Sequence, residues 1–530
     1  MERAGLRRPW LLALGLALAP SLFLLVFFAW PVASIIGRGI SPEALDVLAS
    51  SRIWRIVGFT VMQATLSTLL TLGIALPASY ALHRLRFPGR RILLAMATVP
   101  FVLPTVVVGL AFRALLPSEW IGGLPAILLA HVFFNYAVVV RVVGGLWGRL
   151  DSRYVQVARS LGSSTWRAFW TVTWPLLRPA VSAASALVFL FTFTSFGVVL
   201  ILGGPSTVTL EVEIYRRTAQ QLDLASAATL TLLQLLALVL VLWVSSIIQR
   251  RAAQQRVLVV GIPTRPRGAG ERLVLAWTVS TIFILLVVPL LALIVRSLRV
   301  AGGWGLQWWT SLASIDAGTT RQVAPLESLA VSLRTAVMAT ILSIVLGGLA
   351  AAAIAYSRRG GRVLDTAVMI PLGTSAVTIG FGLLIAFAVP PLDLRGSWII
   401  IPIAHALVAI PLVVRIILPV ARSVDPRLRA VSRTLGATAA RAWWDVDRRF
   451  LTRPAAVACA LAFAVSLGEF GATAFLARSD TPTLPIQIMR LLSRPGEQSL
   501  GAAMALATIL MVLTAVVMLA VERWRPEGSL

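Results

Sequence analysis

The chain contains no lysine, one cysteine and three histidines, so all 47 of its basic residues are arginine. Without lysine it cannot carry the glycine-rich phosphate-binding loop that ends in Lys-Ser or Lys-Thr, and this excludes an ATPase site of that type. The lone Cys459 excludes an internal disulfide framework and a thiol-rich metal site. No carboxylate or cysteine completes a ligand set with the histidines, so we predict no metal site.

Charged residues are also scarce, at 13% of the chain against 58% hydrophobic residues, with a mean hydropathy of +0.88. A run of about 20 apolar residues can cross the hydrocarbon core as a helix. The sequence therefore predicts an all-α polytopic membrane protein with about 12 transmembrane helices. The runs lie near 10–36, 56–82, 92–115, 124–146, 179–202, 226–248, 273–296, 328–356, 364–388, 398–420, 454–476 and 500–521. The first run is too long for a secretory signal core of roughly 7–15 residues, so we expect a retained span.

The net charge of +26 would suit a nucleic-acid binder, but its distribution favours another explanation. With the N-terminus inside, 33 of the 47 arginines but only 9 of the 21 acidic residues fall in cytoplasmic segments or at cytoplasmic span ends. This is the bias that the positive-inside rule describes. We therefore expect cytoplasmic N- and C-termini in a lipid bilayer. We expect no nucleic-acid partner, since the sequence has no soluble basic domain to bind one.

The sequence contains an internal repeat at a fixed separation of 274 residues. The matched residues are His131 and His405, Arg141 and Arg415, Asp151 and Asp425, Arg159 and Arg433, Leu161 and Leu435, Gly162 and Gly436, Phe196 and Phe470, and Arg216 and Arg490. The chain is therefore predicted to consist of two parallel six-helix repeats, 1–250 and 273–530, joined by a cytoplasmic linker at 251–272. Parallel repeats of this kind are typical of transporters.

A cytoplasmic loop of the first repeat, 151–178, combines arginine and tryptophan around a central glycine. Its pattern predicts a short amphipathic helix over 154–161 that ends at Gly162, where a left-handed backbone suits glycine. A serine or threonine at 163–165 is expected to cap a second helix, which Pro175 ends or bends.

The matching loop of the second repeat, 425–453, follows the same plan. A helix is predicted over 429–435, followed by Gly436, the cap Thr438 and the pair Trp443-Trp444. Two interpretations are open. The loops can be interfacial helices with snorkelling arginines, or surfaces on which a cytoplasmic partner docks, which would explain their recurrence.

These loops resemble the EAA loop of ABC importer permeases, whose pattern is Glu-Ala-Ala, three residues, Gly, nine residues and Ile-x-Leu-Pro. The first loop fits at Gln156, Val157, Ala158, Gly162, Val172, Trp174 and Pro175. The second fits at Ala430, Val431, Ser432, Gly436 and Val446, with Arg448 and Arg449 where Leu-Pro is expected. The family's glutamate is absent from both loops, so the two glycines carry the resemblance most firmly.

The resemblance covers nearly the whole chain and implies the type I ABC importer permease fold, in a bacterial plasma (inner) membrane. In that family each loop forms a coupling helix that sits in a groove on an ATP-hydrolysing subunit. The implied partners are two copies of a cytoplasmic ABC ATPase, which binds ATP and Mg, and an extracytoplasmic substrate-binding protein. This chain would bind no cofactor and would work by alternating access. The implied ATPase-coupling residues are Gln156, Ala158, Arg159, Leu161, Gly162, Pro175, Arg433, Leu435 and Gly436.

Two permease units fused in one chain are similar to the thiamine permeases and the related ferric-iron permeases. The segments FTSFGVVLILGGPSTVTLEVEIYR (193–216) and SLGEFGATAFLARSDTPTLPIQIMR (466–490) resemble the thiamine type most. The resemblance thus implies thiamine or its phosphates as substrate, with ferric iron as the alternative.

Polar groups inside spans are candidates for function, because burying them in hydrocarbon is costly. Glu469, whose repeat partner is Ser195, can face the translocation path and attract a cation, or it can hydrogen-bond a neighbouring helix or mark a span end. The other candidate path residues are Phe196, Phe470, Asn135 and Arg113. The pairing of His131 with His405 suggests a shared structural position between packed helices.

The external loops 203–225 and 477–499 are the expected docking region for a binding protein, and we expect their charges to be solvated. Two further classes of protein stay open. An ion-coupled secondary transporter would need intramembrane acids that titrate, for which Glu469 is the one strong candidate. An intramembrane enzyme would need a nucleophile, base or metal cluster, and none stands at helical spacing in the sequence.

Overall fold

The structure is a computed structural model that describes residues 9–40, 42–252, 263–314, 324–357, 360–388, 393–394, 396–478 and 480–524. Within these ranges ten helices are long and apolar enough to cross a membrane, and two bent helix pairs bring the number to twelve. The predicted all-α membrane fold is confirmed. Of the predicted linker 251–272, residues 253–262 lie outside the described ranges.

The helices form two compact units that do not coincide with the sequence repeats. Unit 1 contains Met1–Ala44, Tyr215–Thr231 and Ser297–Ser529, and unit 2 is built mainly from Leu45–Ile214 and Leu232–Arg296. Unit 1 thus combines the first span with spans eight to twelve, and unit 2 combines spans two to five and most of span six with span seven. The first span of each repeat therefore belongs to the unit that contains most spans of the other repeat.

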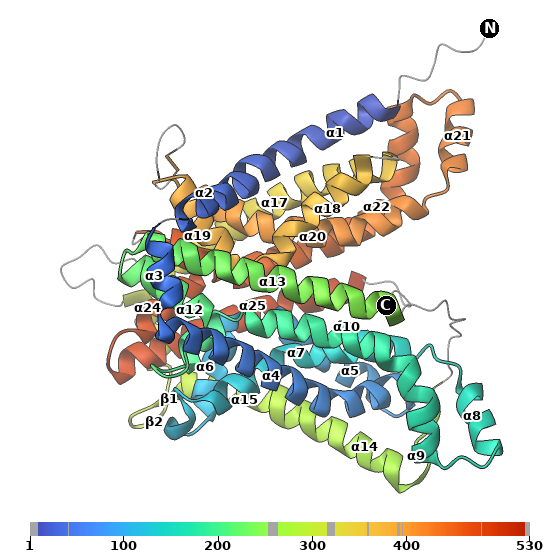
Figure 1. Ribbon diagram of the computed structural model, residues 1–530, viewed down its shortest axis with the longest axis horizontal. Coiled ribbons are helices and arrows are strands. Elements are labelled where there is room, and N and C mark those ends of the chain that lie inside the picture. Colours follow the sequence, from blue (N-terminus) through green and yellow to red (C-terminus); the bar gives the residue numbers. More distant parts are fainter. Residues whose placement is uncertain are drawn as a thin grey trace. The chain divides into compact units, whose positions relative to one another are not determined.

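Unit 2 is organised around three long helices, α4, α7 and α10, with α14 packed against α4 (Figure 1). The buried face of α4 carries Thr60, Ala64, Ser67 and Thr71 at helical spacing, and such small side chains let neighbouring helices approach closely. The elements of this unit and its boundaries are α3 (Glu43–Ala49), α4 (Ser51–Arg84), α5 (Arg90–Thr98), η2 (Val99–Val102), α6 (Thr105–Leu115), η3 (Ser118–Trp120), α7 (Leu124–Trp147), α8 (Ser152–Ser160), α9 (Thr165–Ala168), η4 (Phe169–Thr173), α10 (Trp174–Phe193), α11 (Gly197–Leu202), α12 (Leu210–Tyr215), α13 (Leu224–Ala252), α14 (Gly268–Thr281), η6 (Ile282–Val287) and α15 (Val288–Leu298).

Unit 1 is organised in the same way around α17, α20 and α22, with α1 packed against α17 (Figure 1). The buried face of α17 is again small and polar, with Ser332, Ala336, Ala339 and Ser343. The elements of this unit are α1 (Pro9–Leu24), η1 (Leu25–Ala29), α2 (Trp30–Gly39), η5 (Arg216–Gln220), β1 (Arg299–Val300), β2 (Gly303–Trp304), α16 (Gln307–Ser314), α17 (Glu327–Tyr356), α18 (Gly360–Gly373), α19 (Ala376–Ala386), α20 (Ile400–Ser423), α21 (Pro426–Thr434), α22 (Ala439–Gly468), α23 (Thr473–Leu476), α24 (Leu484–Leu492) and α25 (Glu497–Trp524).

Four spans differ from the sequence prediction because they are bent or end early. Spans three and nine bend by 109° and 99°, at the junctions of η2 with α6 and of α18 with α19. Spans five and eleven end at Phe193 and Gly468, and the short helices α11 and α23 follow each break. Both sides of each break are apolar, so hydropathy continues across it and cannot reveal it.

Gly380 of α19 is a sensitive point in unit 1, because a Cβ added there would lie 2.6 Å from the backbone of Ala472. We expect Gly380→Ala to force the backbone beside α23 to move and to destabilise the protein by about 1–3 kcal/mol. Thermal unfolding in detergent, followed by tryptophan fluorescence, measures the effect.

Gly348 of α17 is the matched control, since a Cβ there meets nothing within 4 Å. Gly348→Ala is expected to be neutral or stabilising by up to about 1 kcal/mol, because alanine is the better helix former. Equal losses of stability in the two variants would show that the contact with Ala472 does not limit this position.

Candidate functional site: two loop helices and two histidine clusters

The cytoplasmic-loop helix of the first repeat, α8, has clear signals at both ends. Asp151 accepts a hydrogen bond from the backbone N–H of Arg153 at 2.9 Å, which caps the first turn. At the other end Gly162 has a φ of +87°, and its N–H donates to the carbonyl of Arg159 at 3.0 Å. The next N–H donates back to Ala158 at 3.0 Å, which completes a Schellman motif.

The loop helix of the second repeat, α21, is built identically. Asp425 accepts from the N–H of Arg427 at 2.8 Å. Gly436 has a φ of +90°, and its N–H donates to Arg433 at 3.0 Å. The helices that the sequence predicts at 154–161 and 429–435 are confirmed, at Ser152–Ser160 and Pro426–Thr434.

Each loop helix is followed by a capped helix that leads into a span. Ser164 accepts from the N–H of Arg167 at 3.2 Å, and Thr438 accepts from the N–H of Arg441 at 3.3 Å, as predicted. Pro175, however, does not end the first of these helices, which continues from Thr165 to Phe193. The π-helical segment η4 lies just before this proline, and its wider turn accommodates the residue that lacks an N–H.

The two loop helices, each at the periphery of its own unit in Figure 1, expose apolar side chains at matched positions. Leu161 is 81% exposed and Leu435 is 84% exposed, next to the two glycines. Val157 and Val431 are exposed one turn earlier. Of the other predicted coupling residues, Gln156, Arg159 and Arg433 are exposed, and Ala158 and Pro175 are half-buried.

The first buried histidine, His131 of α7, joins two neighbouring elements of unit 2. Its Nδ1 lies 2.9 Å from the hydroxyl of Ser67 in α4. Its Nε2 lies 2.8 Å from the hydroxyl of Ser195, which stands in the break between α10 and α11. The imidazole therefore ties the interrupted fifth span to the core of its unit.

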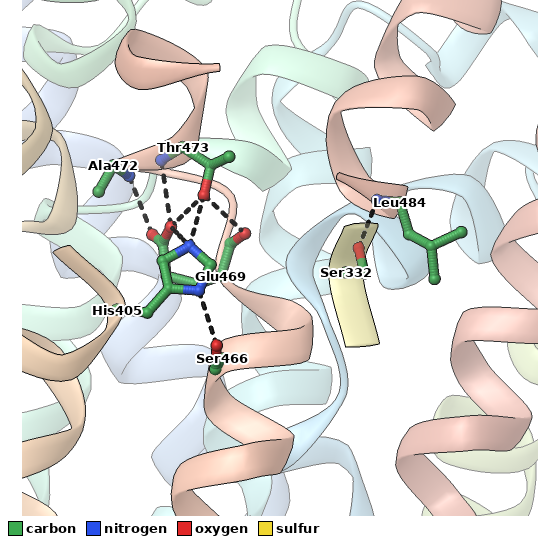
Figure 2. A network of polar contacts seen from close by, with 7 residues as sticks. All are labelled: Ser332, His405, Ser466, Glu469, Ala472, Thr473 and Leu484. Carbon is green, nitrogen blue, oxygen red and sulfur yellow. Dashed lines mark hydrogen bonds and ion pairs between the residues drawn. The ribbon is translucent and has the colours of Figure 1, made fainter. Parts of the chain in front are cut away.

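The second histidine, His405 of α20, occupies the matching position in unit 1 (Figure 2). Its Nδ1 lies 2.7 Å from the hydroxyl of Ser466 near the end of α22. Its Nε2 lies 2.7 Å from the hydroxyl of Thr473 and 3.2 Å from the carboxylate of Glu469. The shared structural position expected for the two histidines is confirmed.

Glu469 holds the break between α22 and α23. Its two carboxylate oxygens accept from the N–H of Ala472 at 2.9 Å and of Thr473 at 3.1 Å, and from the Thr473 hydroxyl at 2.7 Å (Figure 2). These N–H groups open the short helix α23 and would otherwise lack partners. Of the roles considered for Glu469, the structure therefore bears out a hydrogen bond to a neighbouring helix and a position at a span end.

The partners of the two histidines were not predicted from the sequence, and the carboxylate of Glu469 is one of the partners of His405. One signal was available, because His131 precedes Ser195 by 64 residues and His405 precedes Glu469 by the same number. The hydroxyls of Ser67 and Ser466 are not repeat partners of each other, so no pattern could reveal them. Among the residues that the structure describes, no group of three or more metal-ligating side chains gathers.

The remaining path candidates are placed around these breaks, with one exception. Asn135 is buried one turn after His131 and donates to its carbonyl at 2.9 Å. Phe196 and Phe470 are buried directly after Ser195 and Glu469. The side chain of Arg113 in α6 is exposed, apart from this group.

Two acidic residues of the external loop 203–225 are buried and not solvated as expected. Glu211 and Glu213 of α12 are 0% and 1% exposed. Glu213 pairs with Arg52 at 3.4 Å, and Glu211 accepts a hydrogen bond from Gln234 of α13. The expectation of ordinary solvated charges is therefore wrong here, since α12 folds into the molecule instead of lying on its surface.

Comparison with protein families supports what the repeat and the helices suggest. Residues 70–254 and 343–526 both match the model of the binding-protein-dependent transport system inner membrane component. The chain therefore belongs to this family. It is a fused two-domain permease of an ABC importer and a multi-pass inner membrane protein, which confirms the resemblance found in the sequence.

The chain is similar over most of its length to thiamine transport system permease proteins named ThiP. It is 29% identical to that of Escherichia coli (strain K12), with 88% of each chain covered. It is 28% identical to that of Brucella abortus (strain 2308), with 89% of this chain and 88% of the relative covered. It is 26% identical to that of Haemophilus influenzae, with 96% and 95% covered.

Replacing Glu469 tests whether its hydrogen bonds stabilise the break between α22 and α23. We expect Glu469→Ala to destabilise the permease by about 2–4 kcal/mol, because it removes the acceptor for two buried N–H groups and for His405. Glu469→Gln keeps one acceptor oxygen and should cost less. The measurement is the thermal unfolding midpoint in detergent.

Glu497, an exposed acid at the start of α25, provides the control. Glu497→Ala is expected to change stability by less than about 1 kcal/mol, as an exposed charge near a helix N-terminus does. A Glu469→Ala variant as stable as Glu497→Ala would contradict the role assigned to the Glu469 carboxylate.

Proposed function

We propose that this permease imports thiamine or its phosphates, driven by two copies of a cytoplasmic ABC ATPase and supplied by an extracytoplasmic binding protein. The substrate proposal rests on the ThiP relatives, which resemble the chain across both repeats. The identity of 29% over 88% of each chain supports a common architecture, and the relatives' name supplies the substrate class.

The observation that carries the ATPase proposal is the matched pair of loop helices. Two structurally identical helices, one per repeat, each expose a leucine beside a left-handed glycine. Exposing Leu161 and Leu435 almost fully to water is unfavourable, and such side chains at the ends of peripheral helices mark surfaces that a partner covers. An interfacial helix alone would not require the same caps, glycine and leucine in both repeats.

The proposed mechanism is alternating access. In the proposal, ATP closes the ATPase pair, the loop helices move with it, and the outer mouth opens beneath the docked binding protein. Hydrolysis then resets the inward-facing state. The arginine excess of the predicted cytoplasmic segments supports the orientation that this requires, with the loop helices and both termini inside.

We place the two span breaks at the translocation path. Non-helical backbone at membrane depth is tolerated only where protein buries it or where it lines a cavity. The candidate path residues Ser195 with Phe196 and Glu469 with Phe470 stand in these breaks, and Asn135 lies one turn from His131. In this proposal Glu469 acts chiefly as a fixed acceptor that keeps its break open.

Two alternatives are ranked lower. Ferric iron remains the alternative substrate, because ferric-iron permeases share the fused two-unit plan. An ion-coupled secondary transporter loses its support, because the chain belongs to a binding-protein-dependent permease family.

Replacing the exposed leucines tests the ATPase proposal. We expect Leu161→Asp with Leu435→Asp to lower the amount of ATPase that co-purifies with the tagged permease by about tenfold or more, since a charge in each apolar contact must be desolvated. Wild-type permease should bring down two ATPase copies per chain. Quantitative mass spectrometry of mild-detergent preparations gives both numbers.

Leu222→Asp is the matched control, because Leu222 is 78% exposed and lies outside the loop helices. It should leave co-purification unchanged. If the double variant keeps its ATPase, the exposed leucines are not the docking contact. If wild-type permease has no ATPase partner, the importer mechanism proposed here is wrong.

The substrate is tested with the wild-type complex and its binding protein in liposomes. We expect ATP-dependent uptake of radiolabelled thiamine that excess unlabelled thiamine abolishes, and no uptake of ferric iron. Permease without the ATPase is the control for passive leakage. Uptake of iron without thiamine would favour the ferric-iron alternative.

A further inference from the structure

The second loop helix is joined to its span by an ion pair between a half-buried arginine and a buried aspartate. Arg429 of α21 meets Asp447 of α22 through two parallel hydrogen bonds, Nε to Oδ2 at 2.8 Å and Nη2 to Oδ1 at 2.5 Å. Such fork-shaped pairs fix orientation as well as distance, because both groups are planar. Asp447 is only 1% exposed, so solvent screens the pair weakly.

A third element completes this contact. The guanidinium carbon of Arg429 lies 5.2 Å from the ring centroid of Tyr356, at the last residue of α17. The hydrogen bonds to Asp447 raise the pKa of Arg429, so its charge is permanent. One arginine thus joins α21 to both α22 and α17.

The first loop helix cannot form this ion pair. At the separation of 274 residues, Val155 and Thr173 take the places of Arg429 and Asp447. Thr173 is also the last residue of the π segment η4, whereas α22 is α-helical from Ala439 to Gly468. The two repeats therefore share the loop helix itself but differ in how it is joined to its span.

The ion pair stands at one end of a long helix whose other end carries the Glu469 break. From Asp447 to Glu469 the distance along α22 is about 33 Å at 1.5 Å per residue. The helix runs through Pro454 without interruption. A displacement of α21 that is fixed to α22 would therefore reach the cluster of Glu469 and His405 as a movement of one body.

We propose that Arg429 and Asp447 form a rigid joint that transmits movement of the second loop helix to α22, and that the two repeats are consequently coupled to the ATPase unequally. This inference rests on the proposed function, since the ATPase supplies the movement. Arg429 and Asp447 are positioning residues, because they act through α22 and not on substrate. The first loop helix, which lacks the pair, follows its ATPase contact more loosely.

The test uses the full complex of permease, ATPase and binding protein in lipid nanodiscs, with thiamine as the probe. Three permease variants are compared, Arg429→Met, Asp447→Asn, and the charge swap Arg429→Asp with Asp447→Arg. We expect both single variants to keep the ATPase bound at the wild-type ratio. The stimulation of ATP hydrolysis by thiamine-loaded binding protein should fall at least fivefold, and the swap should recover at least half of it.

Hydrogen exchange of the permease alone examines the joint without the ATPase. Amides of 427–434 should exchange at least tenfold faster in the single variants and return toward wild-type rates in the swap. Arg441→Gln is the matched control, since it removes an exposed pair on the same helix, 3.8 Å from Asp445 with Arg441 78% exposed. It should alter neither measurement, because exposed pairs contribute little.

Single variants that keep stimulation within twofold of wild type would overturn the inference, and so would a folded swap variant that recovers nothing. In those cases the wild-type complex still couples, and the proposed function stands. If no ATPase co-purifies with the wild-type chain, the proposed function and the inferred transmission both fail, whatever the exchange rates show.

Discussion

Inside hydrocarbon every backbone N–H and C=O must find a partner within the protein. This constraint explains the polar side chains at the breaks of spans five and eleven. Spans five and eleven are interrupted, and the start of a new helix after each break leaves N–H groups without helical partners. In unit 1 the carboxylate of Glu469 accepts from two of these groups, and His405 fixes its position. In unit 2 the hydroxyl of Ser195 and His131 hold the equivalent break. A matched histidine thus joins each break to its unit, and in unit 1 a carboxylate also accepts from the N–H groups of the break.

The same comparison of copies explains the loop helices. Caps, left-handed glycines and exposed leucines are common to both, which is what two contacts with two copies of one partner would require. The connection between loop helix and span differs between the repeats, because only the second repeat has an arginine and an aspartate at the positions that form the ion pair. Fusion of two permease units in one chain permits this, since each copy can change without the other. The asymmetry therefore lies in the joints between loop helix and span, while the exposed faces of the two loop helices stay alike.

Much of the fold was predictable because its signals are local. Apolar runs gave the spans, and glycine with a following hydroxyl residue gave the ends of both loop helices. The errors arose at positions whose structure depends on tertiary contacts and not on neighbouring residues in the sequence. Of the two effects considered for Pro175, the end of the helix was wrong, because the helix continues through a π segment. Glu211 and Glu213 were expected in water, but α12 carries them inside. The carboxylate partner of His405 lies 64 residues away along the chain, and the sequence brings the two together only through the packing of α20 against α22.

By itself the sequence determined that the chain crosses a membrane about twelve times, that it consists of two parallel repeats, and that without lysine it cannot hydrolyse ATP through a P-loop. It also determined that both loop helices end at a glycine. The left-handed backbone at a helix end favours glycine itself, so this signal can be read from one residue. Only the tertiary structure decided that each repeat packs its first span in the other compact unit, and that Arg429 meets Asp447. Hydropathy and helix periodicity describe which face of a helix is apolar, but they do not say which of many apolar faces it contacts. Which helix faces pack together depends on the shapes of side chains and on polar partners that lie far apart in the sequence. Those residues become neighbours only in the folded structure.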